Sequence, residues 1–152
     1  MRISAKADYA VRAAAELAAA PSGRPVKGEQ LAQSQAIPPK FLENILADLR
    51  NAGLVRTRRG AEGGYALTRP AQEISVAEVM RAVEGPLAAV QGVRPESLHY
   101  AGAAERLPEV WVALRANLRA VLERVTLADL ASGALPASVK ELAAASDAWQ
   151  PH

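Results

Sequence analysis

Hydrophobic residues in the first third of the chain recur every three or four positions, which is the spacing of the buried stripe of an α-helix. This spacing predicts helices over residues 4–20, 27–35 and 38–51, and the third has a strong amphipathic pattern. Ser4 can cap the first helix, and Gly53 is typical of the position after a helix. The chain therefore begins with three helices joined by short connections.

The pattern changes after Gly53. Residues 54–59 and 65–68 read as two strands on either side of a glycine-rich loop, which predicts a β-hairpin with a basic tip. A fourth, short helix begins at Ser75 and ends before Gly85. Residues 87–106 show no periodicity and are interpreted as a linker or loop.

The last strong element is a long helix, predicted over residues 107–131. Its apolar residues alternate in steps of four and three, a heptad pattern that indicates packing along a partner helix. They are Leu107, Trp111, Leu114, Leu118, Val121, Val125 and Ala128. Residues 132–152 form a tail with a weak helical pattern over 137–149. The expected fold is mainly α with a small β-hairpin.

Composition narrows the function. The chain of 152 residues has no cysteine, which excludes disulfides, thiolate catalysis and cysteine-held zinc or iron–sulfur clusters. We expect no cofactor and no metal site. No apolar run reaches the length of a membrane span, and charges interrupt any signal-like start, so we expect a cytoplasmic protein without a membrane partner.

Charge is unevenly distributed. Residues 1–70 carry eleven Lys/Arg and six Asp/Glu, whereas residues 71–152 carry seven and ten. A basic first half favours a polyanionic partner, although a short chain can show such a bias by chance.

Two short helices, a tight turn and a basic hairpin, in this order, predict a winged helix-turn-helix whose second helix enters the major groove of DNA. We expect a DNA-binding domain over residues 1–86, a loop over 87–106, a dimerisation helix over 107–131 and a tail over 132–152. The candidate DNA-contacting residues are Lys40, Glu43, Arg50, Arg56, Arg58 and Arg59. The candidate dimer contacts are Leu107, Trp111, Leu114, Leu118, Val121 and Val125.

Two features are open to a simpler interpretation. The arginines of the hairpin could form a solvated charged surface, but helix, turn and basic hairpin together favour DNA contact. Glu43 lies on the first turn of the predicted reading helix. It could accept a hydrogen bond from a cytosine amino group, or it could be a solvated carboxylate that is favourable near the positive N-terminus of the helix.

Several motifs resemble the Rrf family of bacterial winged-helix repressors, of the IscR, NsrR and CymR type. They cover about residues 1–131, and the stretch from Leu42 to Leu67 is the most specific. The matching segments are Met1-Arg2-Ile3-Ser4-Ala5-Lys6, Tyr9-Ala10-Val11, Phe41-Leu42-Glu43, Leu49-Arg50-Asn51-Ala52-Gly53-Leu54-Val55, Arg59-Gly60, Gly63-Gly64-Tyr65-Ala66-Leu67, Ile74-Ser75-Val76-Ala77-Glu78-Val79, Ala82-Val83-Glu84, Trp111 and Thr126-Leu127-Ala128-Asp129-Leu130.

The resemblance implies a homodimer that reads a palindromic operator on double-stranded DNA. It implies that Glu43 reads or rejects bases in the major groove and that Arg59 enters the minor groove. Pro38 and Lys40 depart from the residues that relatives often carry there, so the operator sequence cannot be carried over.

The largest difference from relatives concerns the cysteines that hold an iron–sulfur cluster in some of them. Cluster-binding relatives carry three cysteines in the loop before the long helix, and residues 88–108 contain none. Some relatives complete the cluster with an acidic residue matching Asp8, but without thiolates we interpret Asp8 as an ordinary first-helix carboxylate. His99, alone in the loop, is interpreted as a surface or hydrogen-bonded residue.

The resemblance then leaves the effector open: a small molecule, a partner protein, or none. Trp111, Tyr100 and Met80 could line a ligand pocket. For Trp111, however, a place in the heptad of apolar residues that packs along a partner helix is favoured. A protein–protein interaction module is the main alternative function. That function predicts a hairpin without basic residues. An enzyme is not expected, because no catalytic triad, phosphate-binding loop or metal spacing occurs.

Overall fold

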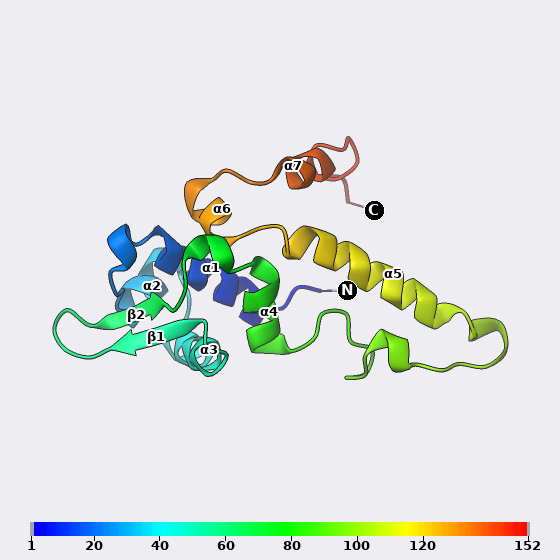
Figure 1. Cartoon of the computed structure of the whole chain (residues 1–152), viewed down its shortest axis with the longest axis horizontal. Coiled ribbons are helices and arrows are strands. Elements are labelled where there is room, and N and C mark those ends of the chain that lie inside the picture. Colours follow the sequence, from blue (N-terminus) through cyan, green and yellow to red (C-terminus); the bar gives the residue numbers. More distant parts are fainter. Residues whose placement is uncertain (1, 152) are drawn as a thin grey trace.

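The structure, a computed structural model, describes residues 2–151; Met1 and His152 lie outside the described residues. The fold is mainly helical with one two-stranded antiparallel sheet, as expected (Figure 1). Its helices are α1 (Ala5–Ala19), α2 (Gly28–Gln35), α3 (Pro39–Asn51), α4 (Val76–Glu84), α5 (Leu107–Leu122), α6 (Leu127–Ser132) and α7 (Ala137–Ala143). Its strands are β1 (Val55–Arg58) and β2 (Gly64–Leu67). Short 3-10 turns cover Pro21–Gly23, Ala71–Glu73, Pro95–Ser97 and Gly102–Ala104.

The ends of the first helices follow local chemistry. The Ser4 hydroxyl accepts a hydrogen bond from the Ala7 amide at 3.0 Å, which caps α1. α2 ends at Ala36, whose φ of 50° turns the chain sharply toward α3. Proline occupies the first turn of α3, where a missing amide N–H costs nothing. The predicted boundaries of these three helices are confirmed to within about one residue.

The predicted hairpin is also confirmed, and a third segment extends it. β1 pairs antiparallel with β2 in a register that places Arg58 opposite Gly64. On the other side of β2, Val26 and Tyr65 exchange two backbone hydrogen bonds of 2.8 Å each. The segment before α2 is thereby tied to the hairpin, which fixes the hairpin relative to the helix-turn-helix.

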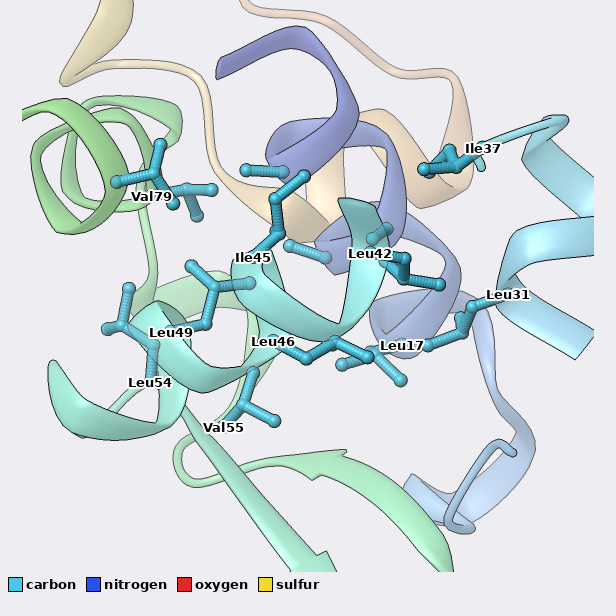
Figure 2. Close-up of a cluster of buried hydrophobic side chains, with 14 of the residues drawn as sticks. Leu17, Leu31, Ile37, Leu42, Ile45, Leu46, Leu49, Leu54, Val55 and Val79 are labelled. Carbon is cyan, nitrogen blue, oxygen red and sulfur yellow. The ribbon is translucent and has the colours of Figure 1, made fainter. Parts of the chain in front are cut away.

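One core joins α1, α2, α3, α4, α6 and the hairpin. α3 directs Leu42, Ile45, Leu46 and Leu49 into it, and all four are at most 2% exposed (Figure 2). On the outer side of the core, Lys6 of α1 forms an ion pair with Asp48 of α3, with 2.7 Å between Nζ and Oδ2. With one face of α3 buried in this way, its opposite face is left to solvent.

The long helix predicted over residues 107–131 is wrong as a single element. α5 ends at Leu122, and Thr126 starts a separate helix, α6, with a capping box in which Thr126 and Asp129 bond each other's backbone amides. The heptad spacing continued by coincidence across this break, because Val125 is buried within its own chain and does not face a partner helix. Val125 is 6% exposed and its carbonyl accepts a 2.9 Å hydrogen bond from Val76.

The break changes the boundary of the folded body. Residues 125–132 return to pack against α1 and the turn Ala71–Glu73, with Leu127 fully buried in the core. The compact body therefore contains α6 as well as residues 2–86. The predicted helical pattern in the tail corresponds to the shorter α7, seven residues long.

α5 extends away from this body (Figure 1). None of its residues is buried, and the apolar side chains along the predicted seam are half-buried: Leu107, Trp111, Leu114, Leu118 and Val121. The preceding residues, 85–106, run outward from α4 beneath α5 to its far end, and contact it through the turn Pro95–Ser97. Within residues 2–151, no helix combines the length and apolar character that a membrane crossing requires.

Candidate nucleic-acid interface

The exposed face of α3 carries the predicted reading residues. Lys40 and Glu43 lie on its first turn and Arg50 on its last, and all three are exposed. No side chain caps the N-terminus of α3, so the first-turn amide of Lys40 is open to an external acceptor. This helix end favours a negative group such as a phosphate.

The wing, defined as residues 55–67, presents the other predicted cations. Arg56, Arg58 and Arg59 are all exposed. The loop between the strands closes through a 3.0 Å hydrogen bond from the Gly63 amide to the Gly60 carbonyl. A side chain at Gly63 would place its Cβ 2.2 Å from the Arg58 carbonyl oxygen, so this tight loop requires glycine there.

A second glycine holds the wing close to the helix-turn-helix. Gly64 has a φ of 147°, and a Cβ there would lie 2.5 Å from the Val26 carbonyl oxygen. The wing can approach the segment before α2 only because this position has no side chain.

A concave surface of about 350 Å³ lies between the wing and the starts of α2 and α3. Glu43 of α3 and Arg58 of the wing belong to its walls, and Leu42, Leu46 and Tyr65 supply apolar lining. The structure thus brings together Glu43 and Arg58, which are separated by 15 positions in the sequence. Lys27, at the start of α2, also lines this surface.

The other predicted residues lie around this concavity and not in it. Arg56 and Arg58 point to the same face of the hairpin, because side chains alternate along β1. Both line a separate hollow of about 520 Å³ together with Arg24. Arg59 lies in the loop at the tip of the wing.

Sequence reasoning missed Lys27 and Arg24. Both are single cations in the loop between α1 and α2, where no helical or strand pattern drew attention to them. Their position in the basic first half was the available signal, and the Val26–Tyr65 pairing is what brings them to the wing.

The cations of this surface form no ion pairs within the part of the chain that the structure describes. Within residues 2–151, no carboxylate lies within 4.0 Å of the cationic groups of Lys27, Lys40, Arg50, Arg56, Arg58 or Arg59. By contrast, ion pairs hold Lys6, Arg12, Arg69, Arg81, Arg106, Arg115 and Arg119. The surface formed by α3 and the wing therefore retains cations that can neutralise an external polyanion.

Carboxylates outside this surface are used within the chain. Burial by itself would raise the pKa of Glu78, but hydrogen bonds from the Ser75 backbone and from Arg69 outweigh it and lower the pKa below its usual value. Glu78 thus closes the capping box of α4 and stays charged. Asp8 pairs with Arg12 at 2.9 Å, one turn along α1.

The residues do not fit an iron–sulfur cluster held by cysteine. The chain has no cysteine, and within the described residues no three His, Asp or Glu side chains gather where they could hold a metal ion. His99 is exposed, with its Nδ1 3.2 Å from the Ser97 carbonyl oxygen. Trp111, Tyr100 and Met80 are half-buried.

Comparisons with known proteins agree with this geometry. The family model Rrf2, described as iron-dependent transcriptional regulator, matches residues 3–133. An HTH-type transcriptional regulator of Mycobacterium tuberculosis, Rv1287, is 55% identical over 143 residues, which are 94% of this chain and 89% of that protein. The HTH-type transcriptional regulator CymR of Bacillus subtilis is 36% identical over 132 residues, 87% of this chain and 91% of that protein.

Solved structures show the same architecture. The structure of CymR, described as the global cysteine regulator of B. subtilis, superposes with a TM-score of 0.73 at 35% identity and covers 88% of this chain and 98% of its own. The structure of T. potens IscR superposes with a TM-score of 0.72 at 33% identity, covering 88% of each chain. These relatives are regulators and not enzymes. The chain is a winged-helix protein that belongs to the Rrf2 family of transcriptional regulators.

Proposed function

We propose that the protein is a sequence-specific DNA-binding repressor that acts as a homodimer on a palindromic operator, without an iron–sulfur cluster. The observation that carries this proposal is the set of unpaired cations on α3 and the wing, which surround a concavity on one face of the body. A protein-interaction wing would have no need of three exposed arginines.

The proposed docking follows from the geometry. α3 enters the major groove with its exposed face, because a B-DNA major groove accepts one helix. Its uncapped N-terminus and Lys40 contact phosphates, and Arg50 does so at the other end of the helix. The wing lies along the adjacent backbone, where Arg59 at its tip reaches the minor groove.

The homodimer supplies the symmetry of the operator. Along α5, the half-buried seam of Leu107, Trp111, Leu114, Leu118 and Val121 would be covered by the same helix of a second copy. The Trp111 indole Nε1 is buried yet has no hydrogen-bond partner within the described residues, and a second chain is expected to provide one. Val125 is left out of this proposed interface, because it is buried in its own chain.

The function is tested by selecting bound duplexes from a random DNA library. We expect an enriched inverted repeat whose half-sites are about one helical turn apart or a multiple of it. The affinity for this repeat should fall steeply with salt, with a log–log slope of about −0.9 for each neutralised phosphate. No enriched repeat together with a flat salt response would favour the protein-interaction module.

Glu43 is expected to set base preference. Replacing Glu43 with Ala should relax discrimination at one base pair of each half-site by about 1–3 kcal/mol, because a carboxylate can accept from a cytosine amino group. Affinity for unrelated DNA should not fall, since a negative charge leaves the interface. Competition binding with single-base operator variants measures this, and Glu141→Ala in α7 is the matched control. An unchanged preference would mean that Glu43 is only a solvated carboxylate.

The absence of cysteine predicts a colourless protein. Material purified without oxygen should show no visible charge-transfer absorption and should bind the selected operator without added iron or sulfide, because no thiolate can hold a cluster. Absorption spectra and iron and sulfide assays check this. Stoichiometric iron and sulfide would overturn it.

A further inference from the structure

Away from the wing, a further cavity lies where α4, the segment after it and α5 meet. Its volume is about 470 Å³. In Figure 1 the wing lies on one side of α4, and α5 with the segment before it lies on the other. The cavity is lined by Arg81, Gly85, Pro86, Leu87, Arg94, Pro95, Glu96, Arg115 and Arg119.

Four arginines from three separate parts of the chain therefore surround one hollow. Arg81 comes from α4, Arg94 from the connecting segment, and Arg115 and Arg119 from successive turns of α5. Arg115 is the most enclosed of those that form ion pairs, with 22% of its side chain exposed. Guanidinium groups rarely gather in this way unless negative groups lie among them, because like charges repel.

The negative groups supplied by the chain cover only half of this charge. Glu96 pairs with Arg115, with 2.5 Å between Oε2 and Nη1. Glu123 is shared: it pairs with Arg81 across the junction and with Arg119 at 3.0 Å along α5. Arg94 forms no ion pair within residues 2–151. Two carboxylates face four guanidinium groups, which leaves two positive charges around the cavity.

The two carboxylates are held in their charged form. Hydrogen bonds from Arg81 and Arg119 lower the pKa of Glu123. A hydrogen bond from its own backbone amide and another from Arg115 lower the pKa of Glu96. Both remain counterions at neutral pH, so the excess positive charge is not an effect of carboxylate protonation.

We propose that this cavity binds a small molecule that carries at least two negative charges on oxygen, either phosphate or carboxylate oxygens. Arginine is suited to such groups, because its planar fork donates two parallel hydrogen bonds to either kind of oxyanion. Arg94, free of ion pairs, provides the first contact, and Arg115 and Arg119 provide donors that their carboxylate partners leave unused.

The position of the cavity gives the ligand a regulatory role, which rests on the proposed function. α4 packs in the DNA-binding body, whereas α5 extends from it with no buried residue, and the Arg81–Glu123 pair joins the two. A bound dianion would join Arg81 of α4 to Arg94 and the arginines of α5. It would thereby fix the angle of α5 and, through the dimer, the spacing of the two α3 helices.

Calorimetric titration of the full-length protein with sodium pyrophosphate, and separately with sodium citrate, tests the site at constant ionic strength. We expect saturable binding of at least one of them, and the tighter one identifies phosphate or carboxylate as the preferred chemistry. Arg94→Ala should weaken binding about tenfold, which is the scale of one lost charge-assisted contact. Arg94 is exposed and unpaired, so this variant is expected to fold normally.

Arg106→Ala is the matched control. Arg106 lies just before α5, pairs only with Glu109 and does not line the cavity, so its variant should bind the anion like the wild type. Arg115→Ala provides a second site variant. The proposal is overturned if neither anion binds saturably at about 10 mM, or if Arg94→Ala and Arg106→Ala bind equally well.

The selected operator adds a separate measurement. Saturating anion is expected to change operator affinity at least about fivefold, a common size for coupling between two sites. Unchanged operator affinity would overturn the regulatory role. If the anion binds but no duplex DNA does, the cavity assignment stands and the proposed function fails.

Discussion

Replacing Arg58 and Arg59 together with alanine is expected to weaken binding to the selected operator by about 10- to 100-fold at physiological salt. Both side chains are exposed on the wing and have no carboxylate partner within the described residues. Their positive charges are therefore available to neutralise phosphates. Each lost contact reduces the number of counterions that binding releases from the DNA. The slope of log affinity against log salt concentration should become shallower by about 1.8, which is about 0.9 for each of the two lost phosphate contacts.

The measurement is fluorescence anisotropy of a labelled duplex at several salt concentrations. Arg106→Ala is the matched control, because Arg106 is also exposed but lies outside the wing and already pairs with Glu109 at 2.6 Å. Thermal melting should show that the wing variant is as stable as the wild type, since exposed substitutions typically change stability by at most about 0.5 kcal/mol. Unchanged affinity and slope in a folded variant would show that the wing does not contact DNA.

Replacing Leu118 with Glu is expected to convert the proposed homodimer into a monomer at micromolar concentration. Leu118 lies in the middle of the α5 seam and is half-buried in the single chain, so a carboxylate there would be trapped without a partner between two helices. Operator affinity should fall by about 10²- to 10⁴-fold, because two linked half-site contacts become two independent ones.

Light scattering and sedimentation measure the assembly state, and anisotropy measures the affinity. Ala116→Glu is the matched control: it introduces the same charge on the same helix at an exposed position opposite the seam. Leu118 lies outside the core of the body, so both variants should keep the wild-type fold. A wild-type monomer, or a Leu118→Glu protein that remains a dimer, would remove the basis for reading a palindrome.

The sequence predicted the helix-turn-helix well for a physical reason. Its helices have apolar residues at helical spacing and end at local signals, such as the Ser4 cap, so short-range interactions fix their bounds. The hairpin followed from its glycine-rich loop in the same way. Glu43 and Arg58 could be proposed one by one, but their meeting across one concavity depended on the wing angle, which Gly64 and the Val26–Tyr65 pairing set.

The heptad pattern gave a wrong helix end, because periodicity does not distinguish burial in the chain's own core from burial against a partner helix. Val125 fits the seam by spacing, yet Thr126 caps a new helix and the chain turns back onto α1. The capping box of Thr126 and Asp129 was present in the sequence and is a helix start signal. The long apolar repeat, however, favoured a single continuous helix.

The sequence by itself determined the first four helices, the hairpin, the family and the absence of thiolate ligands, because these depend on local spacing and on which residue types are present. The tertiary structure alone decided which cations remain unpaired, where α6 packs, and that four arginines from three separate segments surround one cavity. Those features arise from contacts between segments far apart in the chain. Such contacts depend on how the elements pack around the core, and local patterns do not encode the distance between two side chains on different elements.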